Sequence, residues 1–118
     1  MKTAVVMALA ISVSGCIPMS ATEMRERVEA QRLASKLPPA EFVLCVAKRA
    51  PDLYATMRAD VRATADPQSA EVYVYYASML GGIFTAKPGP SGSNIDVLLQ
   101  PGLVSLEHDR VLRAIEGC

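Results

Sequence analysis

The chain has 118 residues, which is enough for one small domain. Its 12 basic and 12 acidic residues balance, so it lacks the positive charge that marks a nucleic-acid-binding domain. It has no tryptophan and only two phenylalanines, so its core must be modest and would benefit from a covalent cross-link.

The first sixteen residues form a leader with a single charge. Lys2 is its only charged residue, and residues 3–15 form an uncharged run. A helix needs about twenty apolar residues to span a bilayer, so this run is too short. A positive start, a short apolar middle and small residues at the end are typical of a secretory signal peptide.

The leader ends in Val13-Ser14-Gly15-Cys16, which resembles the lipobox of bacterial lipoproteins, although leucine is commoner at the position of Val13. The resemblance covers residues 1–16. It implies that residues 1–15 are removed and that Cys16 is acylated on its thiol and on its new amino terminus. Ile17 is not the aspartate that retains lipoproteins in the inner membrane of Gram-negative cells. In such a cell, the resemblance implies the outer membrane, facing the periplasm.

Two further cysteines, Cys45 and Cys118, remain once Cys16 is assigned to lipid. Two remaining thiols in an oxidising periplasm usually pair, so a disulfide between them is expected. It would enclose most of the domain. The long separation and the lack of a Cys-x-x-Cys motif argue against a redox pair, and two free buried thiols are the other alternative.

Residues 16–21 are interpreted as a lipidated tether and residues 22–118 as a single domain. A helix is expected over 22–36, because Ser20 and Glu23 have capping-box spacing and apolar residues recur roughly along one helical face. A second helix is expected over 40–49, with Pro39 in its first turn and Pro51 ending or kinking it.

Residues 53–64 are ambiguous. Their apolar residues alternate perfectly, which is the period of a half-buried strand. However, Leu53, Met57 and Val61 also form an i,i+4 stripe, and the segment is rich in alanine, the best helix former. With Asp52 as a possible cap, the helix is the favoured prediction.

Three strands are expected after this segment, at 71–77, 83–87 and 94–100, with a polar loop over 88–93. The last helix is expected to start at Ser105. This order predicts an α+β fold with two or three N-terminal helices, a three-stranded antiparallel meander and a C-terminal helix, all helices lying on one sheet face. That layout resembles small bacterial envelope proteins. The residues expected beneath the helices are Val72, Val74, Tyr76, Ile95, Val97 and Leu99.

No residue pattern predicts catalysis, a metal site or a cofactor. His108 is the only histidine, and its neighbours Glu107 and Asp109 do not face it on a helix, so it is expected to be an exposed surface residue. One histidine and two paired cysteines cannot supply the ligands of a zinc site. The chain also lacks nucleophile motifs and a glycine-rich phosphate loop.

Tyr73 and Tyr75 are the candidate partner surface. Alternation along their strand places both rings on the face of the sheet away from the helices, where they could bind a protein or a glycan. The alternative is that they are ordinary strand residues that cover the sheet.

The expected function is therefore a lipid-anchored, non-enzymatic envelope protein with a binding or structural role. One alternative is an inhibitor or immunity-type lipoprotein that uses residues 87–93 as a plug. Another is a small cell-wall hydrolase that uses His108.

Overall fold

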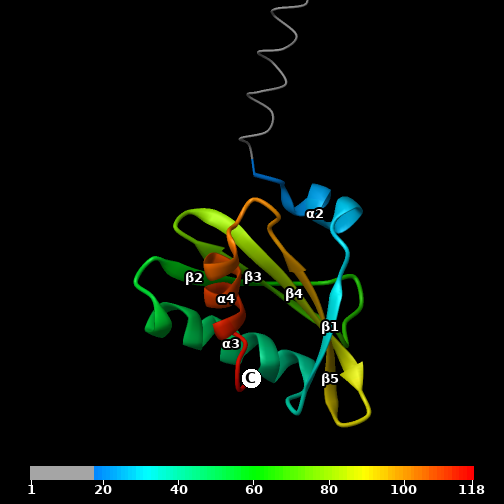
Figure 1. The fold of residues 1–118 in the computed structure, drawn as a ribbon. Coiled ribbons are helices and arrows are strands. Elements are labelled where there is room, and N and C mark those ends of the chain that lie inside the picture. The colour runs from blue at the N-terminus through cyan, green and yellow to red at the C-terminus, as the bar shows by residue number, and fades with distance from the viewer. Residues whose placement is uncertain (1–17) are drawn as a thin grey trace, which may run out of the picture.

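The computed structural model describes residues 18–118 and has the predicted α+β class (Figure 1). The elements in chain order are α2 (Ala21–Arg27), β1 (Gln31–Ser35), α3 (Pro39–Leu53), β2 (Met57–Arg62), β3 (Ala70–Tyr76), β4 (Met79–Gly89), β5 (Gly92–Leu99) and α4 (Ser105–Arg113). The predicted signal peptide and the lipidation of Cys16 lie outside the described residues. No helix within residues 18–118 is long and apolar enough to cross a membrane.

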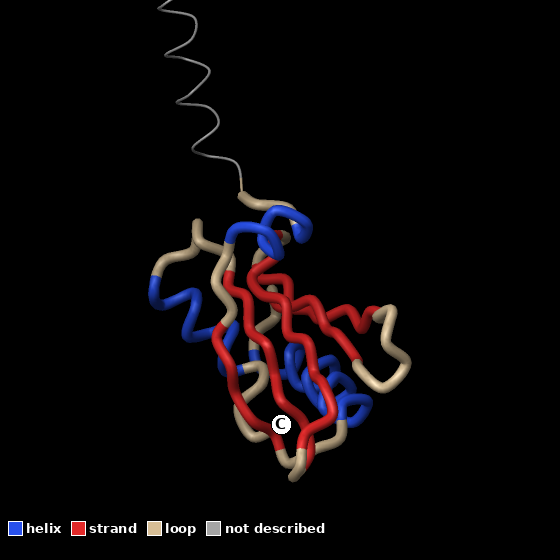
Figure 2. The backbone as a smooth tube through the Cα atoms, turned by 90° about the vertical axis from the view of Figure 1, so that its right-hand side faces the viewer, coloured by secondary structure: helices blue, strands red, loops and turns tan. Residues whose placement is uncertain are grey.

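The strands form one antiparallel sheet in the order β1-β5-β4-β3-β2. The predicted meander is present as β3, β4 and β5, and it is extended by β2 beside β3 and by β1 beside β5, where Leu33 lies opposite Ile95. Figure 2 shows the sheet as one twisted layer with α2 at its upper end and the β4–β5 hairpin at its lower end. Strands β1 and β2 are therefore the two sheet edges.

Helices α3 and α4 pack on the same face of the sheet and form the main core with it. All six residues predicted to lie beneath the helices belong to this core or pack against it. Val111 of α4 approaches β4 closely, since a Cβ atom at Gly81 would stand 2.8 Å from its Cγ2. Ser105 begins α4 as predicted.

Helix α2 covers part of the opposite face, so the prediction that all helices lie on one face is wrong. Met24 of α2 and Ile83 of β4 are both buried, but neither belongs to the main core. Arg25 of α2 contacts Tyr73, whose side chain alternates with that of the core residue Val72. The sheet thus has a large core on one face and a small one on the other.

The first helix is much shorter than the predicted range 22–36. It begins with the predicted capping box, in which the Ser20 hydroxyl accepts the N–H of Glu23 at 3.2 Å, but it ends at Arg27. Residues 31–35 form β1 instead. The five-residue step from Val28 to Leu33 does not follow a helical stripe, and pairing with the distant β5 fixes the extended conformation.

Residues 57–62 form β2, so the helix favoured for 53–64 is wrong. The perfect alternation is the informative signal, because pairing with β3 and packing under α3 outweigh the helix propensity of alanine. Asp52 lies inside α3, which continues through Pro51 to Leu53. Pro51 is tolerated near the helix end, where buried Val46 and Ala50 still hold the last turns to the core.

The loop predicted over 88–93 is a tight turn. Strand β4 continues to Gly89 and β5 begins at Gly92, so only Pro90 and Ser91 connect them. The segment lacks the long exposed loop that an inhibitory plug would need.

Candidate functional site

An open groove of about 1010 Å³ lies between β1, the start of α3, and α4 with the residues that follow it. Its floor is apolar and consists of Leu33, Leu37, Phe42, Ile95, Leu112 and Ile115. Phe42 and Ile95 are each 1% exposed, whereas Leu33 is 44% exposed. The groove therefore leads from the exposed edge of the sheet down to the main core.

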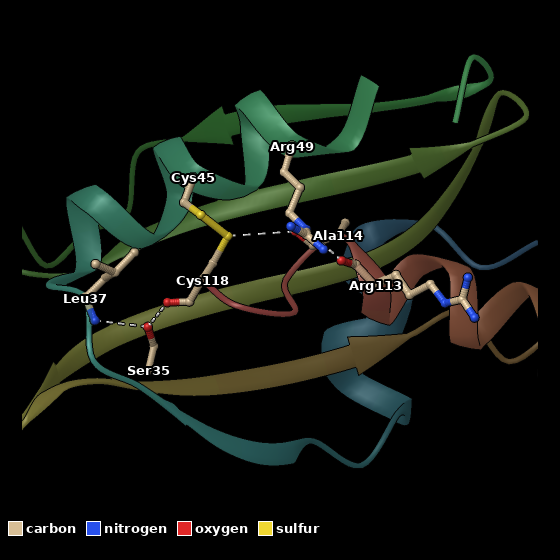
Figure 3. Close-up of a disulfide and its surroundings, with 7 residues drawn as sticks. All are labelled: Ser35, Leu37, Cys45, Arg49, Arg113, Ala114 and Cys118. Carbon is tan, nitrogen blue, oxygen red and sulfur yellow. Dashed lines mark hydrogen bonds between the residues drawn. A yellow bond between two sulfur atoms is a disulfide. The ribbon is translucent and has the colours of Figure 1, made fainter. Parts of the chain in front are cut away.

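A disulfide holds one wall of the groove, which is the segment after α4. It joins Cys45 of α3 to Cys118, as the cysteine count leads one to expect, across a sequence separation of 73 residues (Figure 3). Ser35, at the end of β1, donates its hydroxyl to the backbone carbonyl of Cys118 and accepts the N–H of Leu37 at 3.1 Å. The two walls are thus fixed to each other at this end.

Strand β1 is an open edge beside the groove. It pairs with β5 on one side, no other described strand pairs with its second side, and four of its five residues are exposed. It contains neither a proline nor a bulge, two features that protect sheet edges in other proteins. Its outer backbone groups are therefore available to an added strand.

Charged side chains of both signs surround the groove, namely Lys36, Asp109, Arg113 and Glu116. Arg113 donates to the Tyr54 hydroxyl at 3.3 Å. In the described part of the chain, none of these four side chains forms an ion pair. The rim can therefore interact with charges of either sign, while the floor accepts apolar side chains.

Tyr73 and Tyr75 lie on the sheet face opposite α3 and α4, but this face is not free of helices as predicted, because α2 covers part of it and arginine side chains stack on both rings. The guanidinium carbons of Arg25 and Arg62 lie 5.5 and 4.8 Å from the ring centre of Tyr73, and that of Arg58 lies 4.2 Å from Tyr75. Each such contact contributes about 0.5–1 kcal/mol at an exposed site. The rings are half-buried rather than a bare aromatic surface, and partner binding through them stays a prediction.

Glu71 ties α2 to the sheet beside these rings. It is 7% exposed, and its carboxylate accepts hydrogen bonds from Arg25 at 2.5 Å and from the Thr85 hydroxyl at 2.8 Å. Burial lowers the pKa of Arg25, but the hydrogen bond to Tyr73 and the charge of Glu71 outweigh it, so this pKa is raised and Arg25 stays charged. Sequence reasoning missed this pair because 46 positions separate its members.

His108 is half-buried and not the exposed residue that the sequence predicts. Its Nε2–H donates to the backbone carbonyl of Gln100 at 2.7 Å, and no carboxylate or nucleophile among the described residues hydrogen-bonds to the ring. The arrangement supports a positional role at the start of α4.

Gln100 itself is 1% exposed and fastens the start of the described chain. Its side-chain oxygen accepts the N–H of Met19 at 2.9 Å, and its side-chain nitrogen donates to the carbonyls of Met19 at 2.8 Å and Leu80 at 3.1 Å. Its position at the end of a predicted strand gave no sign of this role.

Within residues 18–118, no group of three or more histidine, cysteine, aspartate or glutamate residues is placed to hold a metal ion. No protein-family model matches the chain, and no curated protein matches it in sequence. The geometry of the groove is therefore the basis for inferring function.

Proposed function

We propose that this protein is a lipid-anchored, non-enzymatic binding protein of the bacterial cell envelope, and that its groove binds an extended peptide segment of another envelope protein. The anchor is the acylated Cys16, and the location is the periplasmic side of the outer membrane in a Gram-negative cell. His108 contacts a backbone carbonyl, which favours a binding role over hydrolysis.

The observation that carries the proposal is that the groove opens onto the free edge of β1. A peptide strand that pairs with β1 can place every second side chain over the apolar floor, because strand side chains alternate between faces. Its backbone gains partners along the edge, and its flanking charged residues meet the rim. These features together favour an extended peptide over a compact small molecule.

The mature protein isolated from the membranes of its own cells is expected to begin at Cys16 and to carry the added mass of its acyl chains. Alkylation is expected to label Cys45 and Cys118 only after reduction, because their thiols are joined. Intact-mass spectrometry with and without reductant measures both properties. A full-length protein without acyl chains would contradict the anchor.

Replacing Leu33 with aspartate is expected to weaken binding of groove-directed peptides. The probes are peptides selected from a random library on the mature chain, and their affinity is measured by fluorescence anisotropy. A charge in the apolar floor should reduce this affinity by at least about tenfold, equivalent to about 1.4 kcal/mol.

Leu44→Asp is the matched control, because Leu44 is 61% exposed on α3 and does not line the groove. Methylating alternate backbone nitrogens of a selected peptide tests strand pairing and should also abolish binding. A variant with both Tyr73→Ser and Tyr75→Ser tests the other surface. If it loses peptide binding while Leu33→Asp keeps it, the binding site is the tyrosine face and not the groove. If all variants bind the peptides with the same affinity, neither the groove nor the tyrosine face is the binding site.

A further inference from the structure

The end of the molecule where the described chain begins has an exposed apolar surface. Val104 and Leu106, at the start of α4, are 62% and 60% exposed. Residues 100–106, which comprise these two residues, Ser105 and the loop before α4, contain no charged residue, and neither do residues 16–22. Met19, in the described part of the second segment, hydrogen-bonds to Gln100 at the start of the first.

Gln100 is the residue that brings the two segments together. Its paired hydrogen bonds to the backbone of Met19 hold that residue beside the β5–α4 loop. Cys16 is only three residues before Met19, so its backbone can lie no more than about 11 Å from this point. Figures 1 and 2 both place α2 at this end of the sheet and the β4–β5 hairpin at the other.

We infer that Val104, Leu106 and the loop 100–103, together the membrane-facing end, lie against the lipid bilayer that holds the acyl chains of Cys16. The inference rests on the anchor proposed above. Residues 100–106 bring no charge of their own to the bilayer, so their apolar side chains gain by entering the interface without a charge being desolvated. The charged side chains of α2 at the same end, such as Arg27, are exposed and can stay among the polar headgroups. The short anchor holds the surface at a high effective concentration, so weak contacts are sufficient.

In this orientation, the end of the groove where Ser35 bonds to the Cys118 carbonyl points away from the bilayer. Strand β1 ends at Ser35, opposite Ser93 of β5, and the Ser93 hydroxyl donates to the carbonyl of Leu37 at 2.6 Å. Ser93 is next to the hairpin turn, at the far end of the 11-residue strand β4. Gln100, where the membrane-facing end begins, bonds to Gly81 of β4, and Gly89 lies eight residues further along that strand. At about 3.3 Å per residue, the hairpin end lies roughly 26 Å from the start of the membrane-facing end.

The test uses the mature chain, residues 16–118, labelled with ¹⁵N and coupled through Cys16 to a thiol-reactive lipid in nanodiscs. The disulfide leaves Cys16 as the single free thiol for coupling. A gadolinium-chelating headgroup lipid then reduces the amide signals of residues near the bilayer. The expected result is the greatest loss over residues 102–106 and the least at Gly89 and Gly92.

Val104→Asp with Leu106→Asp is expected to diminish the loss over residues 102–106, because the tethered domain then reorients freely. Leu44→Asp, which changes an equally exposed leucine on α3, is expected to leave the pattern unchanged. Signal loss at the hairpin equal to that at residues 102–106 would overturn the inference. Chemical coupling supplies the lipid here, so this result is independent of whether the cell acylates Cys16, which intact mass decides.

Discussion

Replacing Gly92 with alanine is expected to lower the free energy of unfolding by about 4 kcal/mol, a large part of the stability of a small domain. Gly92 has a φ of +143°, and a Cβ atom there would stand 2.2 Å from the carbonyl oxygen of Ser35 and 2.5 Å from the carbonyl carbon of Lys36. Both obstacles are backbone atoms, so no side chain can move aside. Urea denaturation of the variant and the parent measures the loss.

Substitutions at two other glycines separate the cost of the Cβ clash from the cost of the positive φ. Gly117 also has a positive φ, +82°, but a Cβ atom there meets nothing within 4 Å. Gly117→Ala is therefore expected to cost about 1 kcal/mol through strain alone. At Gly102, where neither condition holds, alanine should change stability by less than about 0.5 kcal/mol. A Gly92→Ala variant no less stable than Gly117→Ala would contradict the close approach of the hairpin to β1.

Features that depend on neighbouring residues could be predicted from the sequence. The capping box of Ser20 and Glu23, the strand β3 and the start of α4 each follow from a local pattern of a few residues. The core face of the sheet was predictable for the same reason, because side chains alternate along a strand wherever the strand pairs. The cysteine pair followed from counting thiols.

Features that depend on long-range pairing could not be predicted. Strand β1 has no strand period of its own, and it is extended because β5 pairs with it. The groove needs β1, α3 and the segment after α4 together, so no single stretch of sequence contains it. The clamp between Gln100 and Met19 joins residues 81 positions apart. Residues 53–64 are an intermediate case: their alternation indicated a strand, but only the pairing of β2 with β3 decides between that signal and their helix propensity.

Replacing Cys45 and Cys118 together with serine is expected to lower the free energy of unfolding by about 4 kcal/mol, because the bond closes a long loop in the unfolded chain. The groove should lose one wall as well, since the bond fixes the segment after α4 to α3. Urea denaturation measures the first effect. The affinity of the selected peptides measures the second, under conditions where the variant remains folded.

Ser35→Ala is the control that separates the bond from the contacts around it. It removes the hydroxyl that holds the Cys118 carbonyl but keeps the disulfide, so it should cost only about 1 kcal/mol. Peptide affinity is then expected to fall far less than in the double cysteine variant. If the cysteine variant keeps both its stability and its peptide affinity, the packing of Ile115 and Val111 is enough to hold the segment. The disulfide would then have no part in forming the groove.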